Sequence, residues 1–242
     1  MTAQPRRVFD VVSLGTMGYA DALTLQRAAA QARIDGGLSH DVLLLVEHPP
    51  VITLGRSTDG AHLLADSGML AERGVGVHEV ERGGDITFHG PGQLVGYPIV
   101  DLRGHREDLH WYLRRLEDVI IRALATFGID AERREKLTGV WTGGRKIASI
   151  GVHARQWVTW HGFALNVSTD LSYFDLIVPC GIDNVVMTSI ARELAGRGAA
   201  PEALGKDAER AVVQAFGATF DLAPVPTTAD AFRAQLLEAT ER

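Results

Sequence analysis

The chain of 242 residues contains one cysteine, and it has no apolar segment long enough to span a membrane. A single cysteine cannot form an internal disulfide, so Cys180 is either an inert buried thiol or a reactive one. A membrane-spanning helix needs about 20 apolar residues. The N-terminal segment MTAQPRRVFD also lacks the apolar stretch of a secretory signal. We therefore expect a cytoplasmic protein with no membrane partner.

Positive charge is in deficit, and lysine is especially rare. The formal net charge is −6, whereas nucleic acid phosphates favour a basic surface, so we expect no nucleic acid as a partner. Lys136, Lys146 and Lys206 are the only lysines, and arginine supplies the remaining permanent positive charge. A genome-wide composition bias can produce this pattern, so it raises the interest of each lysine only modestly.

Several motifs that carry chemistry are absent from the sequence. There is no phosphate-binding loop of the G-x-x-x-x-G-K-[ST] type and no dinucleotide-binding fingerprint. Ser149 lies in Ala-Ser-Ile-Gly and lacks the preceding glycine of a nucleophile elbow, which favours a strand serine over a serine hydrolase. The histidines form no H-E-x-x-H, and one cysteine cannot make a thiolate cluster for zinc. We expect neither a metal nor a cofactor.

Short apolar runs separated by Gly, Pro and Asp dominate the first half of the chain and predict strands. The predicted strands are Val8–Leu14, Val42–Val46, Val51–Leu54, Val75–Glu81, Ile86–His89 and Gln93–Val100. Tyr19–Ile34 is predicted to be a helix that ends at Gly36-Gly37.

The strongest helical pattern lies within Asp108–Phe127, where apolar residues recur at helical spacing and Gly128 supplies the stop. The strands predicted after it are Val140–Trp141, Lys146–His153 and Val158–Val167, with a tight turn at Gly143-Gly144. Residues after Thr188 are predicted to be helical, with breaks at Gly196–Pro201 and Pro224–Pro226.

Strands and helices are mixed without regular βαβ alternation or internal repeats. This pattern predicts one α+β domain over residues 1–242, with a mixed β-sheet flanked by helices and a helical C-terminal part at 197–242.

The segment Arg82–Tyr97, RGGDITFHGPGQLVGY, packs five glycines and a proline around Thr87, His89 and Gln93. A backbone without side chains can approach a ligand closely, so this density suggests a pocket wall. The alternative is a turn and bulge region whose glycines serve only backbone geometry. A lone histidine is also more often structural than catalytic.

The same segment resembles the signature of the lipoyl(octanoyl) transferase family, part of the biotin and lipoate protein ligase superfamily. The matching residues are Arg82, Gly83, Gly84, Thr87, Phe88, His89, Gly92, Gln93 and Tyr97. Two further blocks agree: GRKIASIGV with WHGFALNV resembles the central hairpin of the family, and IVPCGI followed by MTSI resembles its catalytic cysteine region. The resemblance covers about residues 42–194 and implies the fold of the biotin and lipoate ligase catalytic domain.

The resemblance implies an acyltransferase that carries out the first step of endogenous protein lipoylation. It would move an octanoyl group from octanoyl-acyl carrier protein to the target lysine of lipoyl domains, in 2-oxo acid dehydrogenase E2 subunits and in glycine cleavage H protein. In the family, the positions of Lys146 and Cys180 form the catalytic dyad, with an acyl thioester on the cysteine and the lysine as base. Such a pair can share one proton, because an ammonium favours a thiolate and burial favours a neutral amine.

The resemblance also implies an acyl tunnel walled by three segments. Its residues would be Arg82, Gly83, Gly84, Asp85, Ile86, Thr87, Phe88, His89, Ser149, Ile150, Gly151, Gly162, Phe163 and Ala164. Backbone N–H groups at Gly83-Gly84 and at Ser149–Gly151 are candidates for the oxyanion hole. His161 and Asn166 are either supports of this wall or ordinary strand residues.

Carrier proteins and lipoyl domains are generally acidic, so the resemblance also implies a basic rim near the pocket. Its candidates are Arg56, Arg82 and Arg145.

Two other functions remain open. An ATP-dependent lipoate or biotin ligase shares the wider fold but needs no nucleophilic cysteine, so a requirement for ATP distinguishes it. A non-catalytic protein that binds acyl chains or carrier proteins would leave Cys180 inert in the core, as is usual for a free cysteine. The complete signature and the Pro-Cys-Gly context of Cys180 favour the transferase.

Overall fold

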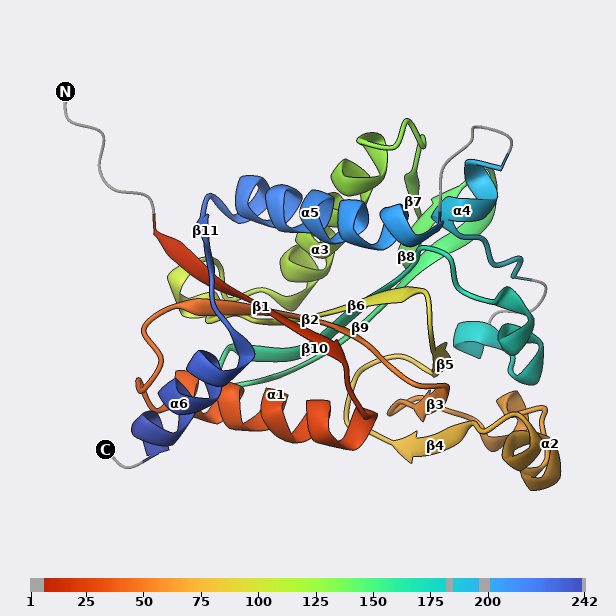
Figure 1. Ribbon diagram of the computed structural model, residues 1–242, viewed down its shortest axis with the longest axis horizontal. Helices are drawn as coiled ribbons and strands as arrows, with labels where there is room; N and C mark the ends of the chain where they lie inside the picture. Colours follow the sequence, from red (N-terminus) through yellow and green to blue (C-terminus); the bar gives the residue numbers. More distant parts are fainter. Residues whose placement is uncertain (1–6, 182–184, 196–200, 241–242) are drawn as a thin grey trace.

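The computed structural model describes residues 7–181, 185–195 and 201–240, which form a mixed eight-stranded sheet with helices on both faces (Figure 1). In spatial order the strands are β11 (Ala223–Pro226), β1 (Val8–Thr16), β2 (Asp41–Glu47), β6 (Gln93–Ile99), β10 (Val158–Asn166), β9 (Arg145–Arg155), β8 (Leu137–Thr142) and β7 (Glu132–Arg134). β1 runs parallel to β2 and β11, and the other neighbouring pairs are antiparallel. The predicted α+β class is confirmed.

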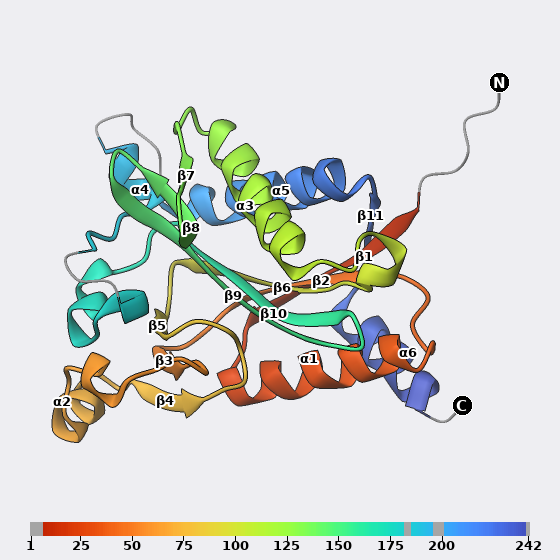
Figure 2. The ribbon, with the colours of Figure 1, turned by 180° about the vertical axis from the view of Figure 1, so that it is seen from behind.

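Two pairs of helices cover the sheet. α3 (Leu109–Ala125) and α5 (Pro201–Phe220) lie on one face, and α1 (Tyr19–Ile34) and α6 (Ala229–Thr240) lie on the other (Figures 1 and 2). The short α4 (Ile190–Glu193) precedes α5. Within the described ranges, no helix combines the length and the apolar character needed to cross a bilayer.

The continuous apolar run Val42–Val46 forms most of strand β2, which is buried on both faces. Leu43 and Leu45 belong to the core under α3 and α5, whereas Val42, Leu44 and Val46 belong to the core under α1 and α6. A strand in the middle of a sheet covered on both faces needs apolar residues on both sides. The run therefore supplies apolar side chains to the cores on both faces of the sheet.

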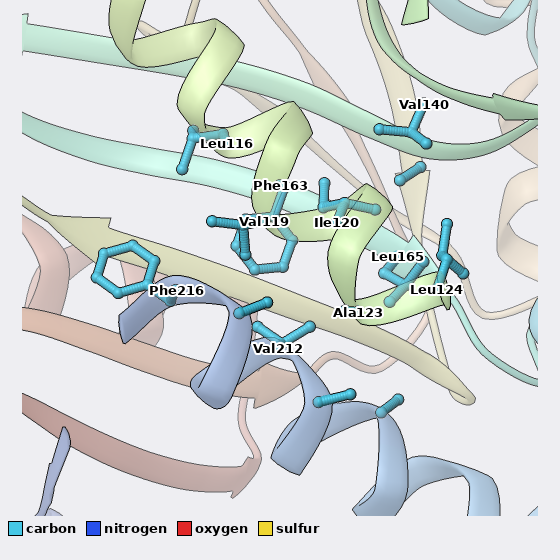
Figure 3. Packing of buried hydrophobic residues seen from close by; sticks show 14 of the residues in the cluster. Leu116, Val119, Ile120, Ala123, Leu124, Val140, Phe163, Leu165, Val212 and Phe216 are labelled. Atoms are coloured by element: carbon cyan, nitrogen blue, oxygen red, sulfur yellow. The ribbon is translucent and has the colours of Figure 1, made fainter. Parts of the chain in front are cut away.

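Helix α3 has the buried face that its sequence predicts, and it lies within the predicted range Asp108–Phe127. The side chain of Asp108 caps its first turn by accepting a hydrogen bond from Trp111 N at 3.0 Å. Gly128 adopts φ +68°, where glycine is favoured, and the chain turns away after it. Figure 3 shows Leu116, Val119, Ile120 and Leu124 of α3 beside Phe163 and Leu165 of β10, with Val212 and Phe216 of α5 below them.

A second, three-stranded sheet lies at one end of the molecule. Its order is β4 (Gly76–Glu79), β3 (Val51–Leu54), β5 (Ile86–His89), and α2 (Ser67–Glu72) lies nearby (Figure 1). Strand β5 leads directly into the turn before β6 of the main sheet. The segment Arg82–Tyr97 thus links the two sheets.

The C-terminal part differs from its prediction at one point. The break expected at Pro224–Pro226 is strand β11, which pairs in parallel with β1 at the edge of the sheet. Proline has no N–H to donate, and an edge strand tolerates this on its solvent side. Elsewhere in the chain, helix α2 and the short strand β7 were not predicted. Residues 196–200 of the other expected break lie outside the described residues.

We predict that Ile120→Ala lowers the free energy of unfolding by about 2–5 kcal/mol, because it leaves a cavity between α3 and the sheet. Urea denaturation measures the change. Arg122→Ala on the exposed side of the same helix should change the free energy by less than about 0.5 kcal/mol. Equal effects of the two substitutions would contradict this packing.

Candidate active site

A cavity of about 240 Å³ lies where the segment Arg82–Tyr97 meets the β9–β10 hairpin. The predicted tunnel residues that line it are Arg82, Gly84, Asp85, Ile86, Thr87, His89, Ser149, Ile150, Gly151, Gly162, Phe163 and Ala164. The lining also includes Tyr97 of the signature and His161, a candidate support of the wall. It is completed by residues that the sequence analysis did not assign: Tyr19, Val95, Lys136, Leu137 and Thr138. Three segments distant in sequence therefore enclose one cavity.

Two predicted tunnel residues do not line this cavity. Phe88 points to the other side of β5, where its ring stacks on Tyr173 with centroids 4.7 Å apart. Side chains alternate along a strand, so Thr87 and His89 face the cavity and Phe88 cannot. Gly83 acts through its backbone, because its N–H donates to Val152 O at 2.8 Å. That bond removes Gly83 N–H as an oxyanion donor.

Gly151 allows the two walls to meet. An added Cβ there would lie 2.7 Å from Gly83 O, closer than side chains are found to backbone oxygens. Only a glycine lets the Arg82–Gly83 backbone lie against β9 at this distance. The glycines of this segment therefore have both predicted roles: they allow the backbone geometry of the turns, and they form part of the cavity wall.

The buried guanidinium of Arg82 contradicts its predicted place in a basic rim. Its Nη2 donates to Thr53 O at 2.7 Å and to Thr53 Oγ1 at 2.9 Å, and only 7% of the residue is exposed. Arg145 forms two hydrogen bonds with Glu193, at 3.0 and 2.8 Å. Of the three candidates, Arg56 is exposed, and its N–H donates to Arg82 O at 3.0 Å.

Lys146 is completely buried at the start of β9. Its N–H donates to Val186 O at 2.8 Å, and its carbonyl accepts from Thr188 N at 2.9 Å. Its Nζ lies 5.2 Å from the centroid of the Trp141 ring, within range of a cation–π interaction. An added Cβ at Gly139 would lie 2.9 Å from Lys146 Cε, so this glycine leaves room for the lysine stem. Lysines are rarely fully buried, which favours a chemical role over the solvated strand residue that would otherwise be expected.

The backbone of Cys180 lies in a 3-10 turn, Pro179–Gly181, whereas its side chain lies outside the described part of the structure. Val178 N donates to His62 O at 2.8 Å, and Gly181 N donates to Val178 O at 3.0 Å. Gly181 adopts φ +62° and packs against the carboxylate of Asp85. Asp85 lines the cavity, so the cysteine turn lies at the cavity edge.

A chain of hydrogen bonds runs from the cavity wall to the segment paired with Lys146. His89 Nδ1 donates to Gln93 Oε1 at 2.8 Å, Gln93 Nε2 donates to Asn166 Oδ1 at 2.9 Å, and Asn166 Nδ2 donates to Thr188 O at 3.0 Å. Thr188 N in turn donates to the carbonyl of Lys146. Asn166 therefore supports the site rather than serving as an ordinary strand residue.

His161 is held in an unusual backbone conformation. Its φ is +56° in the middle of β10, and its N–H donates to Gln26 Oε1 at 3.0 Å. Its Nε2 lies 3.8 Å from Glu81 Oε1, beyond hydrogen-bond range. Such strain in a non-glycine residue is characteristic of functional sites, and here it lies in the cavity lining.

Burial keeps the cavity histidines and tyrosines neutral. The pKa of His89 is lowered to about 3 by burial, with a further contribution from nearby His48. Burial also lowers the pKa of His48 and raises that of Tyr19 to about 12. His48 Nδ1 donates to Met17 O at 2.7 Å, so its Nε2 accepts from the hydroxyl of Tyr97 at 2.8 Å. This part of the wall is polar but uncharged.

Across the described ranges, no three His, Cys, Asp or Glu side chains gather closely enough to hold a metal ion.

Comparison with known proteins places this chain in a class. Residues 18–217 match the model of the lipoyl protein ligase A/B catalytic domain. The crystal structure of a lipoate-protein ligase A bound with ATP superposes with a TM-score of 0.70 at 13% identity, covering 98% of this chain and 95% of that one. The fold is thus that of the lipoate protein ligase catalytic domain.

Curated relatives are much closer in sequence. The octanoyltransferase of Solibacter usitatus is 56% identical over 178 residues, covering 74% of this chain and 80% of that protein. The octanoyltransferase of Synechococcus elongatus is 44% identical over 225 residues, covering 93% of each chain. Within this class, the chain belongs to the octanoyltransferase family.

We predict that the buried, neutral His89 makes the protein less stable in mild acid. The unfolded chain protonates His89 near pH 6.5, whereas the folded protein does so near pH 3. Below about pH 6.5 the unfolded state therefore binds more protons, and the free energy of unfolding falls as the pH falls toward 3. His89→Asn keeps an N–H for Gln93 and removes this titration, so its free energy of unfolding should change less between pH 7 and pH 5.

Urea denaturation at the two pH values measures the difference. His110→Asn, an exposed position on α3, should keep the pH dependence of the parent protein. A parent-like pH dependence in His89→Asn would show that His89 titrates normally.

Proposed function

We propose that this chain transfers an octanoyl group from octanoyl-acyl carrier protein to the target lysine of lipoyl domains, by way of an acyl thioester on Cys180. The observation that carries the proposal is the completely buried Lys146, whose strand pairs with the segment that follows the cysteine turn at the edge of a cavity. Octanoyl transfer is the activity named for relatives at 44–56% identity. The acceptors would be the lipoyl domains of 2-oxo acid dehydrogenase E2 subunits and glycine cleavage H protein, in the cytoplasm.

The cavity provides the acyl-binding surface in this proposal. Val95, Ile150, Phe163 and Ala164 supply apolar lining, next to the neutral polar groups described above. Each buried methylene contributes about 0.8 kcal/mol, so a medium-length chain gains affinity that a short chain lacks. The backbone N–H groups of Gly84 and of Ser149–Gly151 remain candidate donors to the oxyanion.

The first half of the reaction moves the acyl group onto the enzyme. The Cys180 thiolate attacks the carbonyl of the donor thioester, and a new C–S bond forms as the old one breaks. Lys146 gives its proton to the departing carrier thiolate, so the carrier leaves as a thiol and Lys146 becomes neutral. Because Lys146 is buried and its Nζ lies over the Trp141 ring, the amine is held in one position for both proton transfers.

The second half moves the acyl group to the acceptor. The lysine amine of the lipoyl domain attacks the acyl-enzyme, the C–S bond breaks, and neutral Lys146 takes a proton from the nitrogen. This restores the thiolate and ammonium of the resting enzyme. The donor thioester is already activated, so the reaction needs no ATP.

We predict an octanoyl adduct on the purified protein after incubation with octanoyl carrier protein in the absence of ATP. Intact-mass spectrometry detects it. Cys180→Ala should form none, and Lys146→Met, which retains the apolar stem, should form it about 100-fold more slowly. Lys206→Ala, an exposed lysine on α5, should match the parent.

If no adduct forms, and transfer occurs only when ATP and free acid are supplied, the protein is a ligase rather than a transferase. Adduct formation in Cys180→Ala would place the nucleophile elsewhere.

A further inference from the structure

A histidine that the sequence analysis did not single out contacts the cysteine turn at two points. His62 ends a short 3-10 helix, Gly60–His62, and its carbonyl accepts from Val178 N at 2.8 Å. Its ring lies against Gly181, where an added Cβ would be 2.9 Å from His62 Cε1. The imidazole therefore lies beside Gly181, the residue that follows the proposed nucleophile Cys180.

Asp85 fixes the orientation of this ring. His62 Nδ1 lies 2.6 Å from Asp85 Oδ2, and the other carboxylate oxygen, Oδ1, accepts from Ile86 N at 2.7 Å. A carboxylate only accepts, so Nδ1 is the donor in this pair. Among the described residues, none is hydrogen-bonded to Nε2.

The exposure of His62 would allow its ring to contact the acceptor lysine of a lipoyl domain. Its side chain is 28% exposed, whereas that of Asp85 is 9% exposed. The other acid on its own turn, Asp59, accepts a hydrogen bond from Ala61 N at 3.0 Å. Lys146, by contrast, is completely buried. The site thus combines a fully buried lysine with a partly exposed histidine.

The second half-reaction removes two protons from the acceptor nitrogen. The acceptor lysine arrives as an ammonium, because its usual pKa is near 10.4, and it must lose two protons to become an amide. After the first half-reaction, neutral Lys146 can take only one proton. The other proton goes to a second acceptor, which is either solvent or a side chain beside the cysteine turn.

We infer that His62, oriented by Asp85, is the catalytic base that deprotonates the incoming lysine ammonium, an inference that rests on the transfer function proposed above. Nε2 takes the first proton. The neutral amine attacks the thioester carbonyl, the C–N bond forms and the C–S bond breaks. The second proton passes to Lys146, Cys180 leaves as a thiolate, and His62 returns its proton to solvent.

The test separates the two half-reactions in His62→Gln, whose amide can still donate to Asp85. The rate of octanoyl-enzyme formation from octanoyl carrier protein should equal that of the parent. The rate of transfer from preformed octanoyl-enzyme to a lipoyl domain should fall about 100-fold. Hydroxylamine, whose nitrogen is already neutral at pH 7, should remove the acyl group from variant and parent at equal rates.

The controls identify the cause of any loss. His40→Gln, an exposed histidine before β2, should behave as the parent in both half-reactions. His62→Gly should be slow with a lipoyl domain and recover when imidazole is added. Parent-like transfer in His62→Gln, or an equal loss with hydroxylamine, would overturn the inference. Failure of the parent to form an acyl-enzyme would instead overturn the proposed function.

Discussion

A lysine with no exposed surface is the constraint on which the proposed chemistry of this protein depends. Removing an ammonium from water is costly unless partners compensate or the group can become neutral. The fold provides an aromatic face at Trp141 and a backbone without a side chain at Gly139. The β8–β9 strand pair therefore holds the amine in one place inside the protein.

The same strand also fixes the position of the segment around the cysteine. The backbone of Lys146 forms hydrogen bonds with both Val186 and Thr188, beyond the cysteine turn. On the other side of the turn, Val178 is bound to the carbonyl of His62, and Gly181 packs against Asp85. The turn is thus clamped between the main sheet and the segment from the small sheet. Such support from regular elements allows reacting groups to be placed accurately.

The sequence predicted the parts of this arrangement that follow from local patterns. Helix α1 and strands β3 and β5 have their predicted boundaries, because apolar spacing and glycine breaks are local signals. Strand β11 was not predicted, because two prolines at Pro224–Pro226 suggest a break unless the position at a sheet edge is known. Strand alternation could have excluded Phe88 from the tunnel once His89 was placed there.

Features that depend on tertiary contacts were beyond local patterns. The sequence suggested that Arg82 is a rim charge, but its guanidinium is bound to Thr53, which lies on another strand. The pair of His62 and Asp85 joins residues from separate segments, and neither their spacing in the sequence nor a motif predicts it. The proposed role of Lys146 likewise came from family resemblance rather than from its neighbours in sequence.

The central claim is that Lys146 and Cys180 act as one proton-sharing pair, and the pH dependence of Cys180 alkylation tests it most directly. The chain has a single cysteine, so iodoacetamide labelling followed by mass spectrometry reports on this thiol alone. The account predicts that the parent reacts at a pH well below the usual midpoint for a thiol, about 8.5, and that Lys146→Met moves the midpoint upward. Identical alkylation profiles for the parent and Lys146→Met would contradict the pairing.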